Sequence, residues 1–248
     1  MIKKGLVYAI IPARSGSTSV KDKNIRSIRG HPLMAYSIAA AKMADIIDRT
    51  IVTTDSVEYA KISKRYGAEA PFIRPKDISG NLSTDIEFME HAISWFDKNE
   101  GVLPEFWIHL RPTSPLRDPD VIQKAFSLFC RNDEATCLRS AHLSKECPFK
   151  WFTKDEDGYY RTITGITPDE ANGPRQSYPD VFIPNGYVDI LRTDFIIKNH
   201  KLHGDRVLGF EVPPTVDIDY EDDINNVAFD DDNVLLKWLD DHNPRVRP

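Results

Sequence analysis

Cysteine is scarce in this sequence, and the three that occur are too widely spaced for a C-x-x-C metal motif: Cys130, Cys137 and Cys147. This usage fits a reducing compartment. Long apolar runs are missing as well, since no segment approaches the roughly 20 residues that a membrane helix needs. The N-terminus leads directly into an expected strand without a cleavage pattern. We therefore expect a cytoplasmic protein that does not contact a membrane.

Several motifs that define other classes of protein are also missing. There is no G-x-G-x-x-G fingerprint of a dinucleotide-binding fold and no G-x-x-x-x-G-K-[ST] phosphate loop. The seven histidines form no H-x-x-x-H pair. Any bound metal is therefore expected on oxygen ligands rather than on nitrogen or sulfur.

The composition indicates one globular unit. The chain has 248 residues, of which 41% are hydrophobic and 28% charged, which suffices for one substantial core and a small appendage. Residues 1–31 hold seven basic residues and one acid, whereas the rest, with 25 basic and 37 acidic residues, carries a net charge of −12. A cationic patch on an acidic chain favours a small anionic ligand over nucleic acid.

Strand and helix patterns alternate along most of the chain. Short apolar or β-branched runs are separated by stretches in which apolar residues recur at helical spacing. This alternation predicts an α/β fold with a mainly parallel sheet and right-handed crossovers. The helix that opens at Asp118-Pro119 is expected to bury Val121, Ala125 and Leu128, and the last stretch to form one or two helices interrupted at Asp230–Asp232. The expected strands cover residues 6–11, 50–54, 68–73, 106–110, 135–141, 185–191 and 207–212.

The alternation breaks between residues 142 and 182. This segment is rich in proline and aromatic residues and shows no long helical pattern. We interpret residues 1–248 as a single domain with residues 142–182 as an inserted arm. The aromatic side chains of the arm need burial, and a second subunit would provide it most easily, so we expect a homodimer. The aromatic residues concerned are Trp151, Phe152, Tyr159 and Tyr160.

The first strand is followed by a short segment that suits a polyphosphate. Small residues allow the backbone to bend and to bring N–H groups close to a ligand, and nearby arginine and lysine supply positive charge. A solvated basic turn between a strand and a helix is the alternative interpretation. The segment comprises Ala13, Arg14, Ser15, Gly16, Ser17, Thr18 and Ser19, followed by Lys21, Lys23 and Asn24.

Ligands of parallel sheets collect at the carboxyl ends of the strands. The expected strand ends carry the loop just described, Asp55, Arg74-Pro75, the segment 111–117 and the pair Asp217/Asp219. Cations and paired carboxylates around one cleft are what a nucleoside triphosphate with Mg²⁺ requires. In an extended segment two residues apart point to one face, so Asp217 and Asp219 can share a cation. The alternative is that they only begin an acidic helix, where the helix dipole favours carboxylates.

Several motifs resemble one known family. Ala13-Arg14-Ser15-Gly16-Ser17, Lys23-Asn24 and Gly30-His31-Pro32-Leu33 resemble the opening loop of the cytidylyltransferases that activate sialic acid and related nine-carbon 2-keto sugars. Residues 112–117, Pro-Thr-Ser-Pro-Leu-Arg, resemble the family signature Q-P-T-S-P-L-R. Further likenesses follow in family order, at Arg74-Pro75, Pro148-Phe149-Lys150, Pro174-Arg175-Gln176 and Pro184-Asn185-Gly186.

The resemblance implies a Rossmann-like three-layer sandwich of the nucleotide-diphospho-sugar transferase type. It implies transfer of CMP from CTP to the anomeric hydroxyl of the sugar acid, with release of pyrophosphate, for cell-surface polysaccharides. By this likeness Asp217 and Asp219 bind Mg²⁺, and Arg14 and Lys23 act with them in catalysis. The CTP site is implied to comprise Ala13, Arg14, Ser15, Gly16, Ser17, Lys21, Lys23, Asn24, Arg74 and Asp85, and the sugar site Arg111, Thr113, Ser114, Lys150, Asn185 and Gly186.

The chain departs from the family pattern at three positions. Thr18 stands where a lysine usually faces the phosphates, and Lys21 could substitute for it, although its flexible side chain need not bring the charge to the same place. Arg111 replaces the commoner glutamine and could pair with the carboxylate of the sugar acid. Ile183 stands where an arginine that helps to bind sialic acid often precedes Pro-Asn-Gly. Together the last two changes suggest either a different nine-carbon acid or a carboxylate that is held from another side.

Three other functions remain as alternatives to this interpretation. One is a nucleotidyltransferase for another acceptor, such as a hexose phosphate or an eight-carbon sugar acid. A second is a degenerate nucleotide-sugar binder that lost activity with its phosphate lysine. A nicotinamide oxidoreductase on a similar sheet is disfavoured by the missing glycine fingerprint. No side chain in the motifs is an obvious general base, and that role stays unassigned.

Overall fold

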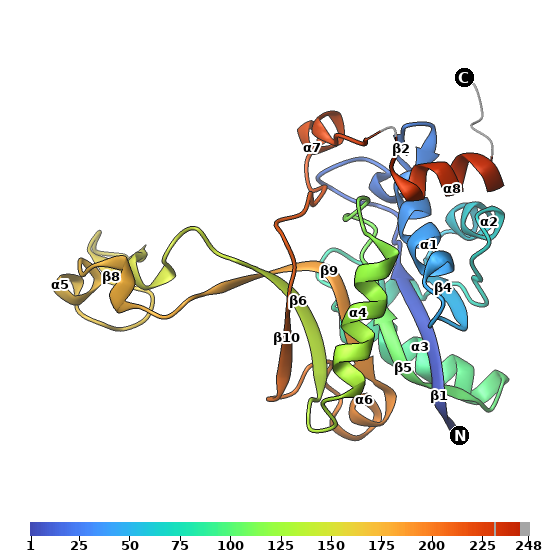
Figure 1. Cartoon of the computed structure of the whole chain (residues 1–248), viewed down its shortest axis with the longest axis horizontal. Coiled ribbons are helices and arrows are strands. Elements are labelled where there is room, and N and C mark those ends of the chain that lie inside the picture. The colour runs from blue at the N-terminus through green and yellow to red at the C-terminus, as the bar shows by residue number, and fades with distance from the viewer. Residues whose placement is uncertain (231, 244–248) are drawn as a thin grey trace.

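The computed structural model describes residues 1–230 and 232–243, and its centre is a six-stranded sheet (Figure 1). The strand order is β10-β6-β9-β5-β1-β4. The strands are β1 (Ile2–Pro12), β4 (Arg49–Thr53), β5 (Leu103–His109), β6 (Cys137–Leu143), β9 (Phe182–Arg192) and β10 (Val207–Glu211).

The sheet is mainly parallel, as predicted. Strand β1 pairs in parallel with β4 and β5, and β6 pairs in parallel with β10. Strand β9 is the exception, because it runs antiparallel to both β5 and β6. The carboxyl ends of β1, β4 and β5 therefore meet at one edge of the sheet, which is where ligands of such folds bind.

Helices cover both faces of the sheet and make a three-layer sandwich, which confirms the predicted fold class (Figure 1). One face is covered by α1 (Leu33–Met43), α2 (Val57–Arg65), α4 (Pro119–Cys130) and α8 (Val234–His242). The other face packs against α3 (Asp85–Asn99) and α6 (Thr193–Asn199). The short helices α5 (Pro168–Ala171) and α7 (Glu221–Asn226) lie outside these layers.

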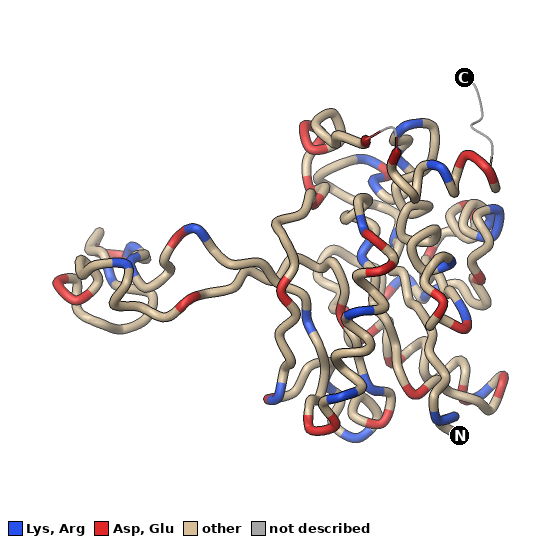
Figure 2. Tube along the Cα trace, viewed as in Figure 1, with Lys and Arg blue, Asp and Glu red and all other residues tan. Residues whose placement is uncertain are grey.

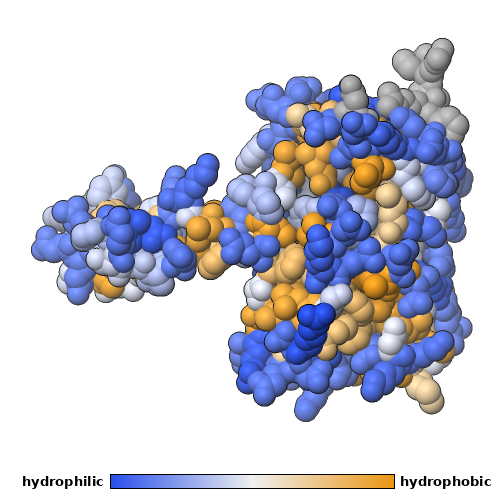
Figure 3. Space-filling view, viewed as in Figure 1, coloured by the Kyte–Doolittle hydropathy of each residue, from blue (hydrophilic) through white to orange (hydrophobic). Residues whose placement is uncertain are grey.

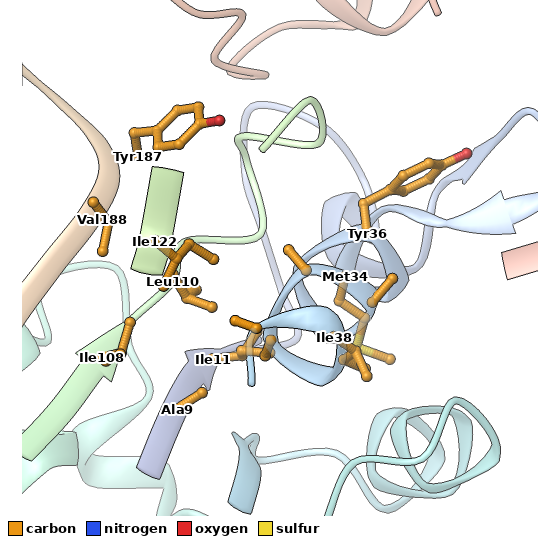
Figure 4. Close-up of a cluster of buried hydrophobic side chains, with 14 of the residues drawn as sticks. Ala9, Ile11, Met34, Tyr36, Ile38, Ile108, Leu110, Ile122, Tyr187 and Val188 are labelled. Atoms are coloured by element: carbon orange, nitrogen blue, oxygen red, sulfur yellow. The ribbon is translucent and has the colours of Figure 1, made fainter. Parts of the chain in front are cut away.

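Alternate side chains of β1 point to opposite faces of the sheet, where they contribute to two separate apolar clusters. Ala9 and Ile11 point toward α1, whose side chains they meet, whereas Tyr8 and Ile10 point toward α3 (Figure 4). Residues 33–41 of α1 are all buried, which explains why this helix has an alanine-rich sequence rather than a narrow apolar stripe. Shortening Ile11 to alanine in such a closely packed layer would lower the free energy of unfolding by about 2–5 kcal/mol.

Two predicted elements differ from the structure. The strand expected over residues 68–73 is wrong, because only a single bridge between Ile51 and Glu69 forms there. Pro71 lacks the N–H that would continue the ladder. Helix α4 is also rotated from its predicted face: it buries Ile122, Ala125 and Phe129, of which only Ala125 was expected.

Residues 144–181 leave the sheet between β6 and β9 and form an arm that extends away from the body (Figure 1). The arm contains the hairpin of β7 (Phe152–Lys154) and β8 (Tyr160–Thr162), together with α5. Its aromatic side chains stay largely exposed, with Tyr159 and Tyr160 each 68% accessible. The space-filling view shows hydrophobic surface where the arm joins the body (Figure 3).

The remaining elements are a short hairpin near the N-terminus and the last two helices of the chain. The short strands β2 (Ser27–Ile28) and β3 (His31–Pro32) form a small hairpin before α1. Helices α7 and α8 flank the predicted interruption at Asp230–Asp232, of which Asp231 lies outside the described residues. Within residues 1–230 and 232–243, no helix is long and apolar enough to cross a membrane.

Candidate nucleotide-binding site

A cavity of about 360 Å³ lies at the carboxyl ends of β1, β4 and β5. Its walls come from segments far apart in the sequence, and they combine four cationic side chains with two carboxylates. The lining residues are Pro12, Arg14, Ser17, Thr18, Ser19, Lys23, Asn24, Arg74, Ser83, Thr84, Asp85, Phe88, Arg111, Pro112, Thr113 and Asp219.

Asp55, at the end of the neighbouring strand, fixes the loop that follows β1. One carboxylate oxygen of Asp55 accepts from the backbone N–H of Ser15 and the other from its hydroxyl, both at 2.7 Å. Burial alone would raise the pKa of Asp55, but these hydrogen bonds lower it below its usual value. Gly16 then takes a backbone φ of +69°, which glycine adopts without steric strain.

Asn24 and Arg14 form the next part of the loop. The side-chain amide of Asn24 is buried and donates to the carbonyl oxygen of Arg14 at 2.9 Å, which ties the two ends of the loop together. The guanidinium of Arg14 donates to the Asn81 side chain at 2.7 Å across the cavity. A phosphate could replace this neutral partner, because a charge-assisted hydrogen bond is the stronger of the two.

Lys23 joins this loop to the C-terminal part of the chain. Its Nζ atom donates to the carbonyl oxygen of Ile218 at 2.9 Å and to Asp219 at 3.1 Å. Lys23 belongs to a short 3₁₀ turn over residues 23–25, which directs its side chain toward residues 218–219. The two motifs that stood 195 positions apart in the sequence are therefore in contact.

Asp217 and Asp219 lie on either side of Ile218, which is fully buried and donates its N–H to the carbonyl oxygen of Thr113. The segment lies outside the sheet, so the strand geometry expected for the pair does not form. Burial and the nearby Asp219 raise the pKa of Asp217, although a hydrogen bond with Thr113 partly offsets them. Two like charges that repel each other in this way would be stabilised by a shared cation. The described residues contain no group of three or more histidine, cysteine or acidic side chains placed to hold a metal.

Arg74 enters the cavity from a buried position. Its guanidinium donates to the backbone oxygen of Thr53 at 2.5 Å and lies over the ring of Phe88, 5.2 Å from its centroid. Burial lowers the pKa of Arg74 to about 10, so the side chain is still charged at neutral pH. A desolvated cation of this kind attracts an anion more strongly than an exposed lysine does.

Arg111 and Asp85 form an ion pair at 2.5 Å between the end of β5 and the first residue of α3. The side chain of Arg111 also lies directly over Gly186, which has a φ of +62°. Arg117 is almost completely buried beneath them and donates to the backbone oxygens of Arg111, Gly186 and Tyr187. The Pro-Thr-Ser-Pro-Leu-Arg segment thus fixes the backbone that carries Arg111, a role that the sequence motif alone did not reveal.

Several of the sequence-predicted residues do not line this cavity. Lys21 is exposed and outside it, and Lys150 lies in the arm, in the 3₁₀ turn Pro148–Lys150. Ser114 is buried, and its hydroxyl has no partner among residues 1–230 and 232–243. Asn185 accepts from the hydroxyl of Ser140 at 2.8 Å, which indicates that it shapes the strand. Ala13 is also structural, since its N–H donates to the Thr53 oxygen.

The sequence analysis missed lining residues on the loop before α3 and on the first turn of this helix. Ser83, Thr84 and Phe88 all contribute to the wall, and Asn81 contacts Arg14. The polar stretch between residues 77 and 85 was the available signal. This stretch could not be assigned to the cavity from the sequence, because no strand ends there and only the tertiary fold brings α3 to the cavity.

Charge is spread evenly over the rest of the molecule. Basic and acidic residues are interspersed over the body and the arm, and no broad basic face appears in this view (Figure 2). The cationic side chains of Arg14, Lys23, Arg74 and Arg111 are instead gathered in one cavity. This distribution suits a compact polyanion such as a nucleoside triphosphate.

A mainly parallel sheet with a cationic cavity at its carboxyl edge defines an α/β nucleotide-binding protein. The sequence profile of the cytidylyltransferase family matches residues 8–163, and the chain belongs to this family. An N-acylneuraminate cytidylyltransferase from Escherichia coli is 32% identical over 203 residues, which cover 82% of this chain and 45% of that protein. A pseudaminic acid cytidylyltransferase from Campylobacter jejuni is 32% identical over 193 residues, covering 77% and 83% respectively.

The fold is similar to that of solved nucleotidyltransferases. A structure of CMP:2-keto-3-deoxy-manno-octonic acid synthetase complexed with CTP superimposes with a TM-score of 0.66 at 14% identity. The match covers 89% of this chain and 95% of that one. At this low identity the match supports the fold alone. Among the sequence relatives, the chain spans less than half of the length of the E. coli protein.

Proposed function

We propose that this protein transfers CMP from CTP to the anomeric hydroxyl of a nine-carbon 2-keto-3-deoxy sugar acid and releases pyrophosphate. The named relatives act on N-acylneuraminate and pseudaminic acid, two acids of this class. The observation that carries the proposal is the single cavity in which Arg14, Lys23, Arg74 and Asp219 meet. This combination of residues fits a nucleoside triphosphate and the metal that accompanies it.

The protein would act mainly by positioning and by charge neutralisation. In the step, the oxygen of the anomeric hydroxyl bonds to the α-phosphorus of CTP and gives up its proton to solvent, and the bond from that phosphorus to the bridging oxygen of pyrophosphate breaks. Negative charge grows on the pyrophosphate as it leaves. Arg14 and Lys23 stand at the loop that would hold it, and hydroxyl groups of Thr18 and Ser19 line the same wall.

Mg²⁺ is part of the proposal, with Asp217 and Asp219 as its protein ligands. The donor set fits a hard cation, because both groups are carboxylates and the raised pKa of Asp217, caused by burial and by Asp219, reflects a repulsion that a cation would relieve. When bound, the ion would supply positive charge to the phosphates. Lys23 pairs with Asp219 at 3.1 Å and lines the same cavity, so its charge would act on the phosphates together with that of the ion.

The acceptor would enter from the side of Arg111. This guanidinium can bind a planar carboxylate through two parallel hydrogen bonds, but Asp85 already occupies one of its nitrogens. Thr113, whose hydroxyl donates to Asp217, also lines the cavity and can accept a hydrogen bond from a sugar hydroxyl. Ile183, which stands where an arginine is common in the family, is exposed at the start of β9 and supplies no charge.

A homodimer formed through the arm is a second part of the proposal. Trp151, Phe152, Tyr159 and Tyr160 are each at least 44% exposed, which is unusual for aromatic side chains in a small lobe. Light scattering after size exclusion should give twice the chain mass of 28.3 kDa. Tyr160→Asp should shift the protein to monomer, while Ile197→Asp on α6, a control at another exposed hydrophobic residue, should not. A monomer at micromolar concentration for the unmodified chain would contradict the proposal.

We also propose a cytoplasmic location. The cysteines support it: Cys130, Cys137 and Cys147 are all free thiols, and two of them are buried. Fractionation of cells that express the tagged chain, followed by detection in the soluble fraction, tests this placement. Recovery outside the cytoplasm with oxidised thiols would contradict it.

The activity is tested by pyrophosphate release. The protein is incubated with CTP and Mg²⁺ and with a panel of nine-carbon keto acids, an eight-carbon sugar acid and a hexose phosphate. We expect turnover with one nine-carbon acid, and its loss in Asp219→Ala but not in Asp222→Ala, an exposed neighbour in α7. Turnover with another acceptor would correct the substrate class.

Binding of CTP without turnover on any acceptor would favour the degenerate binder over the enzyme. Thr18 would then be the first residue to examine, because it lines the cavity where the family has a lysine. Under the degenerate-binder alternative Thr18→Lys should restore pyrophosphate release. Under our proposal the unmodified chain is already active.

A further inference from the structure

A second cavity, of about 680 Å³, adjoins the nucleotide cavity. The two share Ser83, Thr84, Asp85 and Arg111 as a common wall. The far side of the second cavity is formed by β6 and by the loop after α6. The residues found there are Arg139, His200, Lys201, Leu202, His203 and Gly204.

Arg139 belongs to a row of polar side chains across three adjacent strands. In the sheet register, Asp189 of β9 lies beside His109 of β5 on one side and beside Arg139 of β6 on the other. The neighbouring row, two residues away, consists of Cys137, Leu191 and Trp107, all packed in the apolar core below α3 and α6. The face of the sheet therefore changes from apolar to charged at the cavity.

Folding alone does not account for this row. Asp189 is 1% exposed and His109 is 2% exposed, and burying an ionisable group costs free energy unless it is well paired. Their pairing is loose: Nε of Arg139 lies 3.4 Å from one oxygen of Asp189, and Nδ1 of His109 lies 3.9 Å from the other. Nε2 of His109 has no partner within the described part of the chain. Apolar residues of similar size would pack there at lower cost.

Arg139 is the member of the row that reaches the cavity. Its Nε atom faces Asp189, and its two terminal nitrogens make no hydrogen bond or ion pair with any residue in 1–230 or 232–243. The side chain is 29% exposed, so these nitrogens are partly desolvated and open to a ligand. Arg111, by contrast, is already paired with Asp85 at 2.5 Å.

We propose that the second cavity holds the acceptor and that Arg139 binds its carboxylate, with Asp189 and His109 positioning the guanidinium from below. This inference rests on the proposed function. A planar carboxylate matches the two free nitrogens of Arg139. The carboxylates of Asp85 and Asp189 lower the net charge around the cavity, which suits a monoanion better than a phosphate. The reacting hydroxyl would then point across the shared wall toward the nucleotide.

The test compares the acceptor acid with its methyl ester, which keeps the shape and lacks the charge. Steady-state kinetics on both are measured for the unmodified protein and for Arg139→Met. We expect the unmodified protein to prefer the acid at least 50-fold in kcat/KM, and Arg139→Met to prefer it less than fivefold. CTP affinity, measured by calorimetry, should stay within twofold. Lys198→Met, at an exposed lysine of α6 that lines neither cavity, is the control and should keep the preference.

Arg139→Met removes the cation beside the buried carboxylate of Asp189 and is expected to lower the stability of the fold. A second variant that keeps a positive charge at this position is therefore included. Arg139→Lys keeps a positive charge beside Asp189 but cannot bind a carboxylate through a planar fork. It should melt near the unmodified protein and lose at least fivefold in kcat/KM for the acid with little change for the ester. A full acid preference in either folded variant would overturn the assignment while the proposed function stands. If no acid is turned over or bound while CTP binds, both the function and this site fail.

Discussion

The side chain of Arg111 occupies the space where Gly186 would carry a Cβ atom. A Cβ built on Gly186 would lie 2.6 Å from Cδ of Arg111 and 3.1 Å from its Nε, closer than packed atoms approach. Gly186 also has a φ of +62°, which disfavours other residues. Gly186 therefore leaves room for the side chain of Arg111, which belongs to the wall shared by the two cavities.

Substitution Gly186→Ala should displace Arg111 and weaken its pairing with Asp85. We expect the KM for the acceptor to rise about tenfold or more and the melting temperature to fall. The control is Gly101→Ala, which has a φ of +69° but open space around its Cβ. Because Gly101→Ala strains the backbone without a collision, comparing the two variants separates backbone strain from the collision with Arg111. Equal loss of acceptor affinity in both variants would refute the role of Gly186.

Asp55 should control nucleotide affinity without touching the nucleotide. Asp55→Asn keeps one acceptor oxygen for Ser15 and replaces the other by a donor, so one of the two hydrogen bonds at 2.7 Å is lost. Losing a charge-assisted hydrogen bond costs about 1.5–3 kcal/mol, which corresponds to roughly 10- to 150-fold weaker CTP binding if the loop must re-form on binding. Calorimetry with CTP measures it, and the exposed Asp45→Asn is the control. Unchanged CTP affinity would show that the loop is held by other contacts.

His109 should make the stability of the fold sensitive to acid. Burial and the nearby Arg111 lower the pKa of His109 from 6.5 to about 4. The unfolded chain thus binds a proton at a higher pH than the folded one, and stability falls as the pH drops from about 6.5 to 4. The full loss is about 3 kcal/mol at roughly 1.4 kcal/mol per pKa unit.

Urea unfolding at a series of pH values tests this dependence. His109→Gln should flatten the decline between pH 6.5 and 4, although its stability at neutral pH can be lower because packing against Phe88 changes. His200→Gln, at an exposed histidine, should leave the decline in place. A steep decline that persists in His109→Gln would assign it to other groups.

Metal affinity should depend on Asp217 and on pH. Because burial and Asp219 raise the pKa of Asp217, protons should compete with a cation at a higher pH than at an ordinary aspartate. Mn²⁺ binding, followed by electron paramagnetic resonance in the presence of CTP, should weaken as the pH falls. Asp217→Asn should bind at least tenfold more weakly and lose most of this pH dependence. Binding that is unaffected by Asp217→Asn would place the ion elsewhere.

The sequence predicted the overall fold because its main signals are local. Apolar runs such as that of β1 and the proline start of α4 depend on nearby residues, and the structure confirms them. The predicted strand over residues 68–73 failed at Pro71, whose missing N–H outweighs the β propensity around it. Strand β9 follows the arm and runs antiparallel to both of its neighbours, and no local sequence pattern encodes this direction.

The nucleotide cavity was partly predictable because the strand-end rule brings distant motifs together. Arg14 and Lys23 follow β1 and were found in this way, whereas Arg74 and Asp219 were predicted by the same rule although no strand of the sheet ends directly before them. The row of His109, Asp189 and Arg139 was not found, because it arises from register between strands far apart in the chain. Each of these residues looks unremarkable in its own segment. Only the pairing of the strands reveals that the three side chains share one face.

The measurement that tests the central claim most directly is the identification of the products. The protein is incubated with CTP, Mg²⁺ and the preferred nine-carbon keto acid, and the mixture is followed by phosphorus NMR and mass spectrometry. We predict one equivalent each of pyrophosphate and of a diester that joins CMP to the sugar acid, formed at the same rate. CTP that stays intact, or that yields free CMP without a sugar ester, would contradict the account.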